Sequence, residues 1–118
     1  MRVLEFDVNR QKITKTKGCD FKHLVAGSVG YLKAKFNFSN NGNAWAGCAK
    51  AASFWKDDKE YAVLLDANNC CNIPDEVADG RVFYVSVTGA IRCSNMIKGE
   101  VSEYVINTNK IKVVQGVG

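Results

Sequence analysis

Thiols are the side chains of this 118-residue sequence that could do chemistry of their own. A cysteine beside the single histidine, His23, could act as a nucleophile, because an imidazole can take the thiol proton. Nothing beyond residue type brings a cysteine to His23, and the absence of a CxxC pair argues against zinc. An odd number of cysteines with one adjacent pair does not favour a disulfide framework. We therefore expect free thiols and no metal site. The five cysteines are Cys19, Cys48, Cys70, Cys71 and Cys93.

Carboxylates are the other candidate reactive groups, and most of them fall in predicted turns. Their spacing does not pair them for acid–base catalysis, so solvated turn residues are the favoured interpretation. The sequence also lacks the glycine loops that hold phosphates and the motifs of zinc proteases and serine hydrolases. We expect no catalytic residues, no cofactor and no enzymatic activity. The acids in question are Asp57, Asp58, Glu60, Asp75, Glu76 and Asp79.

Strands must position these residues, because apolar and polar side chains alternate along most of the chain. Residues 61–66 are largely apolar on both alternating sets, which predicts a strand covered on both faces. Gly89 is expected to end the strand before it, an extension of a strand through residues 91–93 stays open, residues 94–99 should form a loop, and residues 75–79 should form one helical turn. The predicted strands are Arg2–Val8, Lys12–Lys17, Ser28–Ser39, the two arms of a hairpin around residues 57–60, Arg81–Thr88, Glu103–Thr108 and Lys110–Gln115.

About seven to nine short strands, with frequent turn signals and no convincing helix, predict an all-β fold. An antiparallel β-sandwich is the first choice, and a small, partly open β-barrel is the alternative. One domain should occupy residues 1–115, with residues 116–118 as a frayed tail or the start of a linker. Trp45 and Trp55 are expected to pack in the core or against the hairpin. The alternative, that either forms a surface binding platform, stays open.

Charge is distributed unevenly along the sequence. Residues 1–35 hold eight basic and three acidic residues, whereas the whole chain has a net charge of +4. A solvated lysine face is favoured over a nucleic-acid surface, because no aromatic stacking pattern accompanies the charge. Glu5 and Asp7 interrupt the position where a signal peptide would be apolar, and no apolar run is long enough for a membrane helix. We expect neither export nor membrane contact.

Segments spread over nearly the whole chain carry a resemblance to a known family. They are LEFDV (4–8), TKTKGCDF (14–21), VAGSVGYLKAKF (25–36), WAGCAKAASFW (45–55), YAVLLD (61–66), CNIPDEV (71–77), FYVSVTG (83–89) and INTNKIKVVQG (106–116). Together they resemble a small domain of phage and prophage virion proteins from Gram-positive gut bacteria. The resemblance implies an Ig-like β-sandwich in a head fibre, tail or baseplate, with no catalytic residues. Two stretches, residues 39–43 and 90–104, are longer than this pattern implies.

The expected function is therefore a non-enzymatic structural, assembly or adhesion module of a virion, made in the cytoplasm of the bacterial host. Its expected partners are other virion proteins and further copies of itself, as a trimer or dimer, and a host surface is a further candidate. The alternative is an anti-defence inhibitor that binds a host protein or a signalling nucleotide. A nucleic-acid-binding barrel is a third hypothesis. Candidate binding residues, chosen by position at loop tips, are Asn40, Asn41, Asn43, Asp57 and Asp58.

Overall fold

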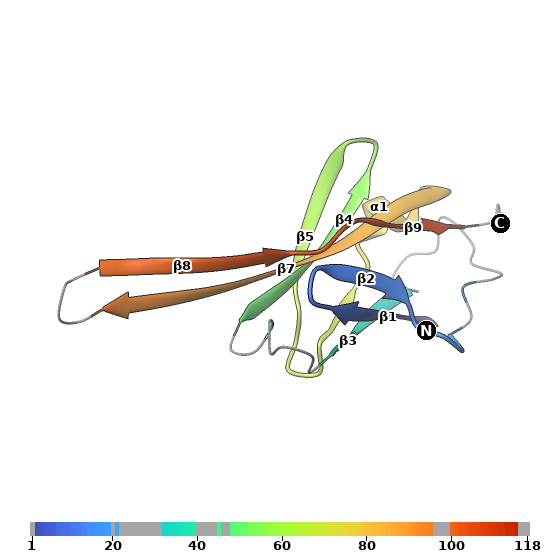
Figure 1. Ribbon diagram of the computed structural model, residues 1–118. Helices are drawn as coiled ribbons and strands as arrows, with labels where there is room; N and C mark the ends of the chain where they lie inside the picture. The colour runs from blue at the N-terminus through green and yellow to red at the C-terminus, as the bar shows by residue number, and fades with distance from the viewer. Residues whose placement is uncertain are drawn as a thin grey trace.

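Strands dominate the computed structural model of this chain (Figure 1). The structure describes residues 2–19, 21, 32–39, 45, 48–95 and 100–115, and the backbone alone at 91–95 and 100–104. Within these ranges there are nine strands and one short helix, α1 (Asp75–Ala78). The strands are β1 (Arg2–Asn9), β2 (Lys12–Lys15), β3 (Leu32–Phe38), β4 (Ala49–Lys56), β5 (Lys59–Leu64), β6 (Cys70–Asn72), β7 (Val82–Asn95), β8 (Glu100–Asn107) and β9 (Ile111–Val114).

Two sheets pack face to face, which confirms the predicted all-β sandwich. The first sheet has the order β2-β1-β3-β6. The second has the order β5-β4-β7-β8, and β9 pairs with β7. Every pairing is antiparallel except that of β1 with β3, which is parallel. This parallel pair was not expected from the sequence, because alternation within a strand carries no information about the direction of its neighbour.

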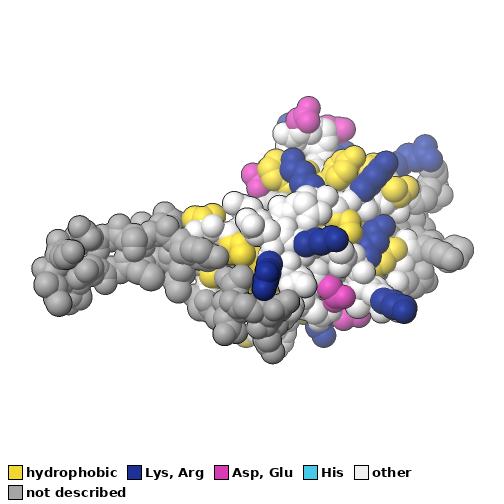
Figure 2. Space-filling model, in the orientation of Figure 1, with side chains coloured by type: hydrophobic (Ala, Val, Ile, Leu, Met, Phe, Trp, Pro, Cys, Tyr) yellow, Lys and Arg dark blue, Asp and Glu magenta, His cyan; other side chains and the backbone are white. Residues whose placement is uncertain are grey.

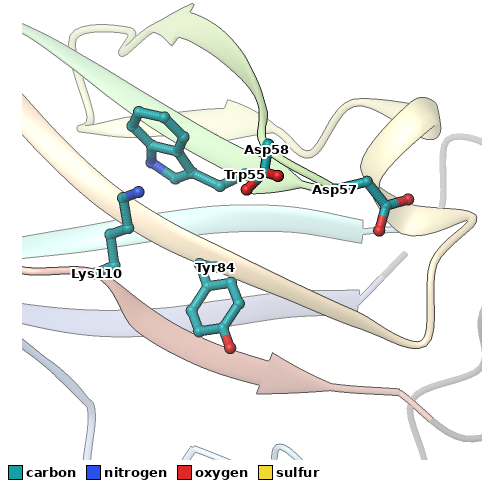
Figure 3. Close-up of a pocket in the computed structure, with 5 residues that line it drawn as sticks. All are labelled: Trp55, Asp57, Asp58, Tyr84 and Lys110. Carbon is teal, nitrogen blue, oxygen red and sulfur yellow. The ribbon is translucent and has the colours of Figure 1, made fainter.

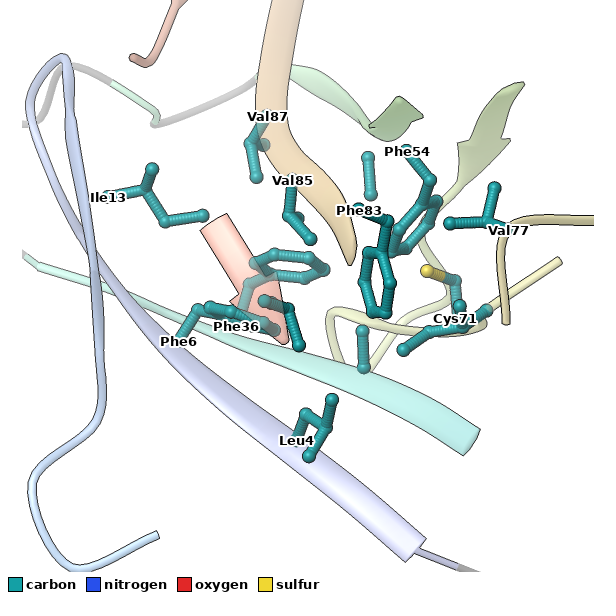
Figure 4. Close-up of a cluster of buried hydrophobic side chains, with 14 of the residues drawn as sticks. Leu4, Phe6, Ile13, Phe36, Phe54, Cys71, Val77, Phe83, Val85 and Val87 are labelled. Carbon is teal, nitrogen blue, oxygen red and sulfur yellow. The ribbon is translucent and has the colours of Figure 1, made fainter. Parts of the chain in front are cut away.

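Alternating side chains from both sheets form the core (Figure 4). In β1, Leu4, Phe6 and Val8 point inward and are fully buried, as predicted. The Phe6 ring stacks on Phe36 of β3, with centroids 5.4 Å apart. The second sheet contributes further buried phenylalanines and valines to the same core: Phe54, Phe83, Val85 and Val87. In β1, β3 and the described side chains of β7, the inward set is thus the set that the alternation identified.

Trp45 is a core residue, as the first interpretation proposed. Its side chain is 3% exposed and lies against the ring of Phe38. The indole N–H donates to the carbonyl oxygen of Arg10 at 2.7 Å, so its polar atom is satisfied inside the fold. A Cβ built on Gly89 would lie 2.7 Å from the Trp45 ring. Gly89 therefore provides the space that this tryptophan occupies.

The prediction that Gly89 ends its strand is wrong. Strand β7 continues to Asn95 and pairs with β8 as far as the Asn95–Glu100 pair. Positions 94 and 95, predicted as loop, belong to this ladder. In Figure 1 the distal part of the β7–β8 hairpin projects from the sandwich as an arm, and the molecule measures 59 × 28 × 22 Å. Glycine often ends a strand, but at position 89 the missing side chain leaves room for the Trp45 ring.

The prediction that residues 61–66 are covered on both faces is also wrong. Strand β5 is an edge strand of the second sheet. Tyr61 and Val63 point inward and are half-buried, whereas Ala62 and Leu64 point outward, with Leu64 76% exposed. The sequence pattern of β5 correctly indicated apolar side chains on both faces of the strand. It did not show that this chain covers both.

Short connections agree with the predicted breaks. The helical turn at residues 75–79 forms α1 after Pro74, and β6 ends before that proline. The last two strands separate at Thr108 and Asn109, where β8 gives way to β9. The Asn109 side-chain oxygen accepts a hydrogen bond from the backbone N–H of Ile13 at 2.9 Å. This contact ties the edge of the first sheet to the connection at the edge of the second.

Candidate functional site

The outer face of the second sheet exposes apolar side chains where a solvated sheet face is normally polar. Strand register fixes which residues share it, because directly opposed residues point to the same side of a sheet. Within the paired strands this outer face has small, apolar and aromatic side chains and two charged ones, Glu60 and Lys112. Its members are Ala49, Ala51, Ser53, Trp55, Glu60, Ala62, Leu64, Val82, Tyr84, Ser86, Thr88, Ala90, Val105, Asn107, Lys112 and Val114.

Large apolar side chains on this face are exposed to solvent. Leu64 is 76% exposed, Val114 55% and Val105 49%. Val82 and Tyr84 are exposed as well. An antiparallel sheet normally presents polar side chains on its solvated face, so this face has the composition of a surface that packs against something.

A pocket of about 540 Å³ opens at one end of the outer face, near the β4–β5 turn. Figure 3 shows its five lining residues: Trp55, Asp57, Asp58, Tyr84 and Lys110. The Trp55 indole N–H donates to the Ser86 hydroxyl at 3.0 Å. The Lys110 ammonium lies 3.7 Å from the centroid of the Trp55 ring, a close cation–π contact. Both contacts hold Trp55 in place on the outer face.

Asp57 and Asp58, two of the predicted binding residues, form the two-residue turn between β4 and β5. Their φ angles are 49° and 66°, the left-handed values of a type I′ hairpin turn. Both are exposed, and both line the pocket. The structure thus brings them next to Trp55, which the sequence analysis left open as a platform. In Figure 2 acidic side chains gather at the tip of this hairpin, above lysines and exposed hydrophobic side chains.

The other three predicted binding residues, Asn40, Asn41 and Asn43, lie outside the described residues. The structure adds Tyr84, Lys110 and Lys112 to this region, which the sequence analysis did not select. A signal was present: the predicted outward positions of residues 81–88 carry Tyr84, Ser86 and Thr88 and no charge. That pattern is unusual for a solvated face, and it could have pointed to this surface.

The pocket combines aromatic faces with charges of both signs. Two carboxylates and one ammonium give it a net charge of −1 when all three are ionised. The exposed ring surface of Tyr84 can stack on a planar or apolar group. Asp57 and Asp58 can accept hydrogen bonds, while Lys110 can donate them. Such a surface suits a protein side chain or another mixed polar and apolar group.

A second, smaller hollow of about 300 Å³ lies between the sheet edges at β5 and β6. Adjacent Cys70 and Cys71 line it but sit on opposite faces of β6, with Cys71 buried in the core. Burial raises the pKa of the Cys71 thiol to about 12. Backbone N–H groups of Cys70 and Asn68 donate to Asp66 and lower the pKa of that carboxyl. Asp66 thereby shapes the turn that leads into β6.

Thiols and other metal-binding groups do not cluster in the described part of the chain. Cys19, Cys70 and Cys71 are not in disulfide bonds. The described residues contain no group of three histidine, cysteine or carboxylate side chains that could hold a metal ion. His23 and the side chain of Cys93 lie outside what is described.

No helix in the described ranges has the length and apolar character to cross a membrane. Comparison of the chain with protein-family models, with curated proteins and with solved structures finds no match.

Proposed function

We propose that this chain is a non-enzymatic structural, assembly or adhesion module of a phage virion, in a head fibre, tail or baseplate. The observation that carries the proposal is the exposed apolar outer face of the second sheet. Leu64, Val105 and Val114 stand on three different strands of this face, and each exposes apolar surface that a subunit of an assembly buries against a neighbour. The sequence resemblance supplies the kind of assembly.

Purified particles provide the direct test. Virions would be induced from a strain that encodes the chain, separated on a density gradient and analysed by quantitative mass spectrometry. A module of the virion should co-sediment with the particles at a fixed copy number per capsid and resist a high-salt wash. Recovery of the chain in the soluble lysate alone, with particles that lack it, would exclude the proposal. A known capsid protein and a soluble host enzyme serve as the two reference proteins.

A second candidate, a phage inhibitor that sequesters a signalling nucleotide, has one observation in its favour. The exposed ring of Tyr84 could stack on a base, and Lys110 could meet a phosphate at the same pocket. Asp57 and Asp58 oppose this, because their carboxylates would repel a phosphate. Native mass spectrometry of the purified chain separates the two functions. Extra mass that matches a nucleotide favours the inhibitor, and bare protein favours the assembly module.

A further inference from the structure

One row of side chains runs straight across the outer face of the second sheet. The register places Glu60 of β5 opposite Trp55 of β4, and Trp55 opposite Tyr84 of β7. Tyr84 in turn stands opposite Lys112 of β9. The order across the four strands is therefore acid, aromatic, aromatic, base. Neighbouring strands are about 4.8 Å apart, so the two charges are separated by roughly 14 Å and do not pair within one chain.

This row is complementary to its own reverse. If a second row is laid on it in the opposite direction, each acid meets a base and each tryptophan meets a tyrosine. We propose that the outer face of the second sheet packs on the same face of a second copy, around a two-fold axis parallel to the strands between β4 and β7. This inference rests on the proposed function, because it names the partner that the assembly face would take.

The charges decide between the possible two-fold axes. For two faces to meet, the axis must lie in the plane of the interface. An axis parallel to the strands reverses the row and pairs Glu60 of each copy with Lys112 of the other. An axis perpendicular to the strands keeps the row in order and sets Glu60 against Glu60. Like charges across an interface disfavour the second arrangement.

The flanking residues agree with the axis parallel to the strands. Asp57 and Asp58 stand at the β4–β5 end of the face, whereas the backbone of Lys110 stands before β9, beyond β7, and its side chain reaches back over Trp55 into the same pocket. Reversal brings the acidic turn of one copy towards the lysines of the second. It also brings Leu64, at the β5 edge, close to Val105 of the other copy, one row away in the β8 column. The two exposed apolar residues cover each other.

Two other features prepare the face for close packing. Small side chains occupy the centre of the outer face, where Ser53 stands between Ala62 and Ser86, and neighbouring side chains leave Ser53 and Ser86 only 3% and 7% exposed. In the first sheet, by contrast, the outer face carries Glu5, Asp7, Lys12, Lys33 and Lys35. Charged residues of that density resist burial, so the chain has one face suited to water and one suited to a partner.

The size of the face sets the expected strength of the contact. Five rows over four strands span about 14 by 27 Å between outer Cα positions. With side chains included, two such faces bury roughly 1,000–1,200 Å² in total, near the lower limit for a specific interface. We therefore expect a reversible dimer whose population depends on protein concentration, and sedimentation equilibrium over a wide concentration range is the suitable measurement.

Charge exchange provides the test. The single variants E60K and K112E should each weaken dimerisation by tenfold or more, because each homodimer then contains two like-charge contacts. The double variant E60K/K112E should restore the affinity to within about threefold of the original. An equimolar mixture of the two single variants should also dimerise, because the mixed dimer pairs opposite charges at both contacts. Neither rescue is possible within one chain, since the two positions are too far apart to touch.

A matched control reverses a charge on the other sheet. Glu5→Lys lies on the outer face of the first sheet and should leave the dimer unchanged. Ala51→Arg, near the centre of the proposed interface, should give a monomer with an unchanged far-ultraviolet circular dichroism spectrum. A wild-type chain that stays monomeric at millimolar concentration would overturn the inference. A dimer whose dissociation constant is unchanged by the charge exchanges and by Ala51→Arg would also overturn it.

The outcome also separates this inference from the proposed function. A chain that is present in virions but does not dimerise through this face would keep the structural function and assign the face to another protein. A chain that dimerises as described but is missing from virions would refute the proposed function alone.

Discussion

Single residues on opposite faces of the second sheet have different tasks. Facing inward, Gly89 makes room for Trp45, and the indole satisfies its N–H on a backbone carbonyl. Facing outward, Trp55 bonds to Ser86 and is covered on its ring by Lys110. The two tryptophans look alike in sequence, yet one belongs to the core and the other to the surface. Local packing, and not residue type, assigns these tasks.

Gly89→Ala should destabilise the fold by about 1–3 kcal/mol, because the added methyl overlaps the Trp45 ring in a filled core. Chemical denaturation monitored by tryptophan fluorescence would measure the change. In a Trp45→Leu background the same substitution should cost much less, since the ring that it meets is gone. An equal cost in both backgrounds would show that strand geometry, and not the ring, requires glycine.

The buried thiol of Cys71 predicts a dependence of stability on alkaline pH. Its pKa is raised from 9.0 to about 12 in the folded chain, so the native state holds the proton more tightly than the unfolded state does. The contribution of the protonated Cys71 thiol to the free energy of unfolding is therefore fully present below pH 9. It is lost as the pH rises from 9.0 towards 12. Cys71→Ala removes this titration. The stability difference between the two proteins should shrink by about 1–2 kcal/mol between pH 8 and pH 10.5.

Urea unfolding at the two pH values measures this difference. Comparison with Cys71→Ala cancels the titration of lysines and tyrosines, which the two proteins share. A difference that is constant with pH would show that the thiol titrates alike in the folded and unfolded chain.

At the scale of elements, alternation predicted the inward and outward sets of the strands well. The inward positions of β1, of β3 and of β7 up to Ala90 follow it, because a half-buried strand leaves this signal in the sequence. It failed at β5, where apolar residues on both faces indicate two apolar surfaces but not what covers them. It also failed at Gly89, where a residue that usually breaks strands is required by a side chain far away in sequence.

The candidate site, too, was predicted from the sequence only in part. Asp57 and Asp58 were selected from the sequence by their position at a predicted polar turn, and both line the pocket. Tyr84 and Lys112 were missed, because strand register brings them to Trp55 and Glu60 from elsewhere in the chain. Register depends on the whole sheet, so no local pattern could have supplied the row across the outer face.

The β4–β5 turn gives a prediction at the element scale. Both turn residues have positive φ, where asparagine and glycine are preferred over aspartate. The double substitution Asp57→Asn/Asp58→Gly should raise stability by about 0.5–1 kcal/mol, because glycine relieves the left-handed strain at the second position. Replacing both by alanine should lower it, since alanine tolerates this region poorly. Thermal unfolding of the three proteins under identical conditions gives the order.

At the scale of the whole molecule, the chain is more extended than a compact domain of its length. Its radius of gyration is 15.6 Å. A compact domain of this many residues would have a value of about 13.5 Å. The β7–β8 arm accounts for the difference, because it continues the ladder past the sandwich (Figure 1). The arm also gives the molecule a direction along its strands, and any symmetric pairing must place two such arms.

The directions in which the two arms project depend on the two-fold axis, so the shape of the dimer reports its symmetry. A two-fold axis parallel to the strands preserves direction along them, so both arms project from the same end. The longest dimension of the dimer should then stay close to the 59 Å of one chain, while its thickness grows. An axis perpendicular to the strands would place one arm at each end and lengthen the particle well beyond that value. Small-angle X-ray scattering on the dimer peak of a size-exclusion column distinguishes the two, with Ala51→Arg as the monomer standard. A maximum dimension near that of the monomer, together with a doubled mass, is the expected result, and a clearly longer particle would contradict the charge pairing between Glu60 and Lys112.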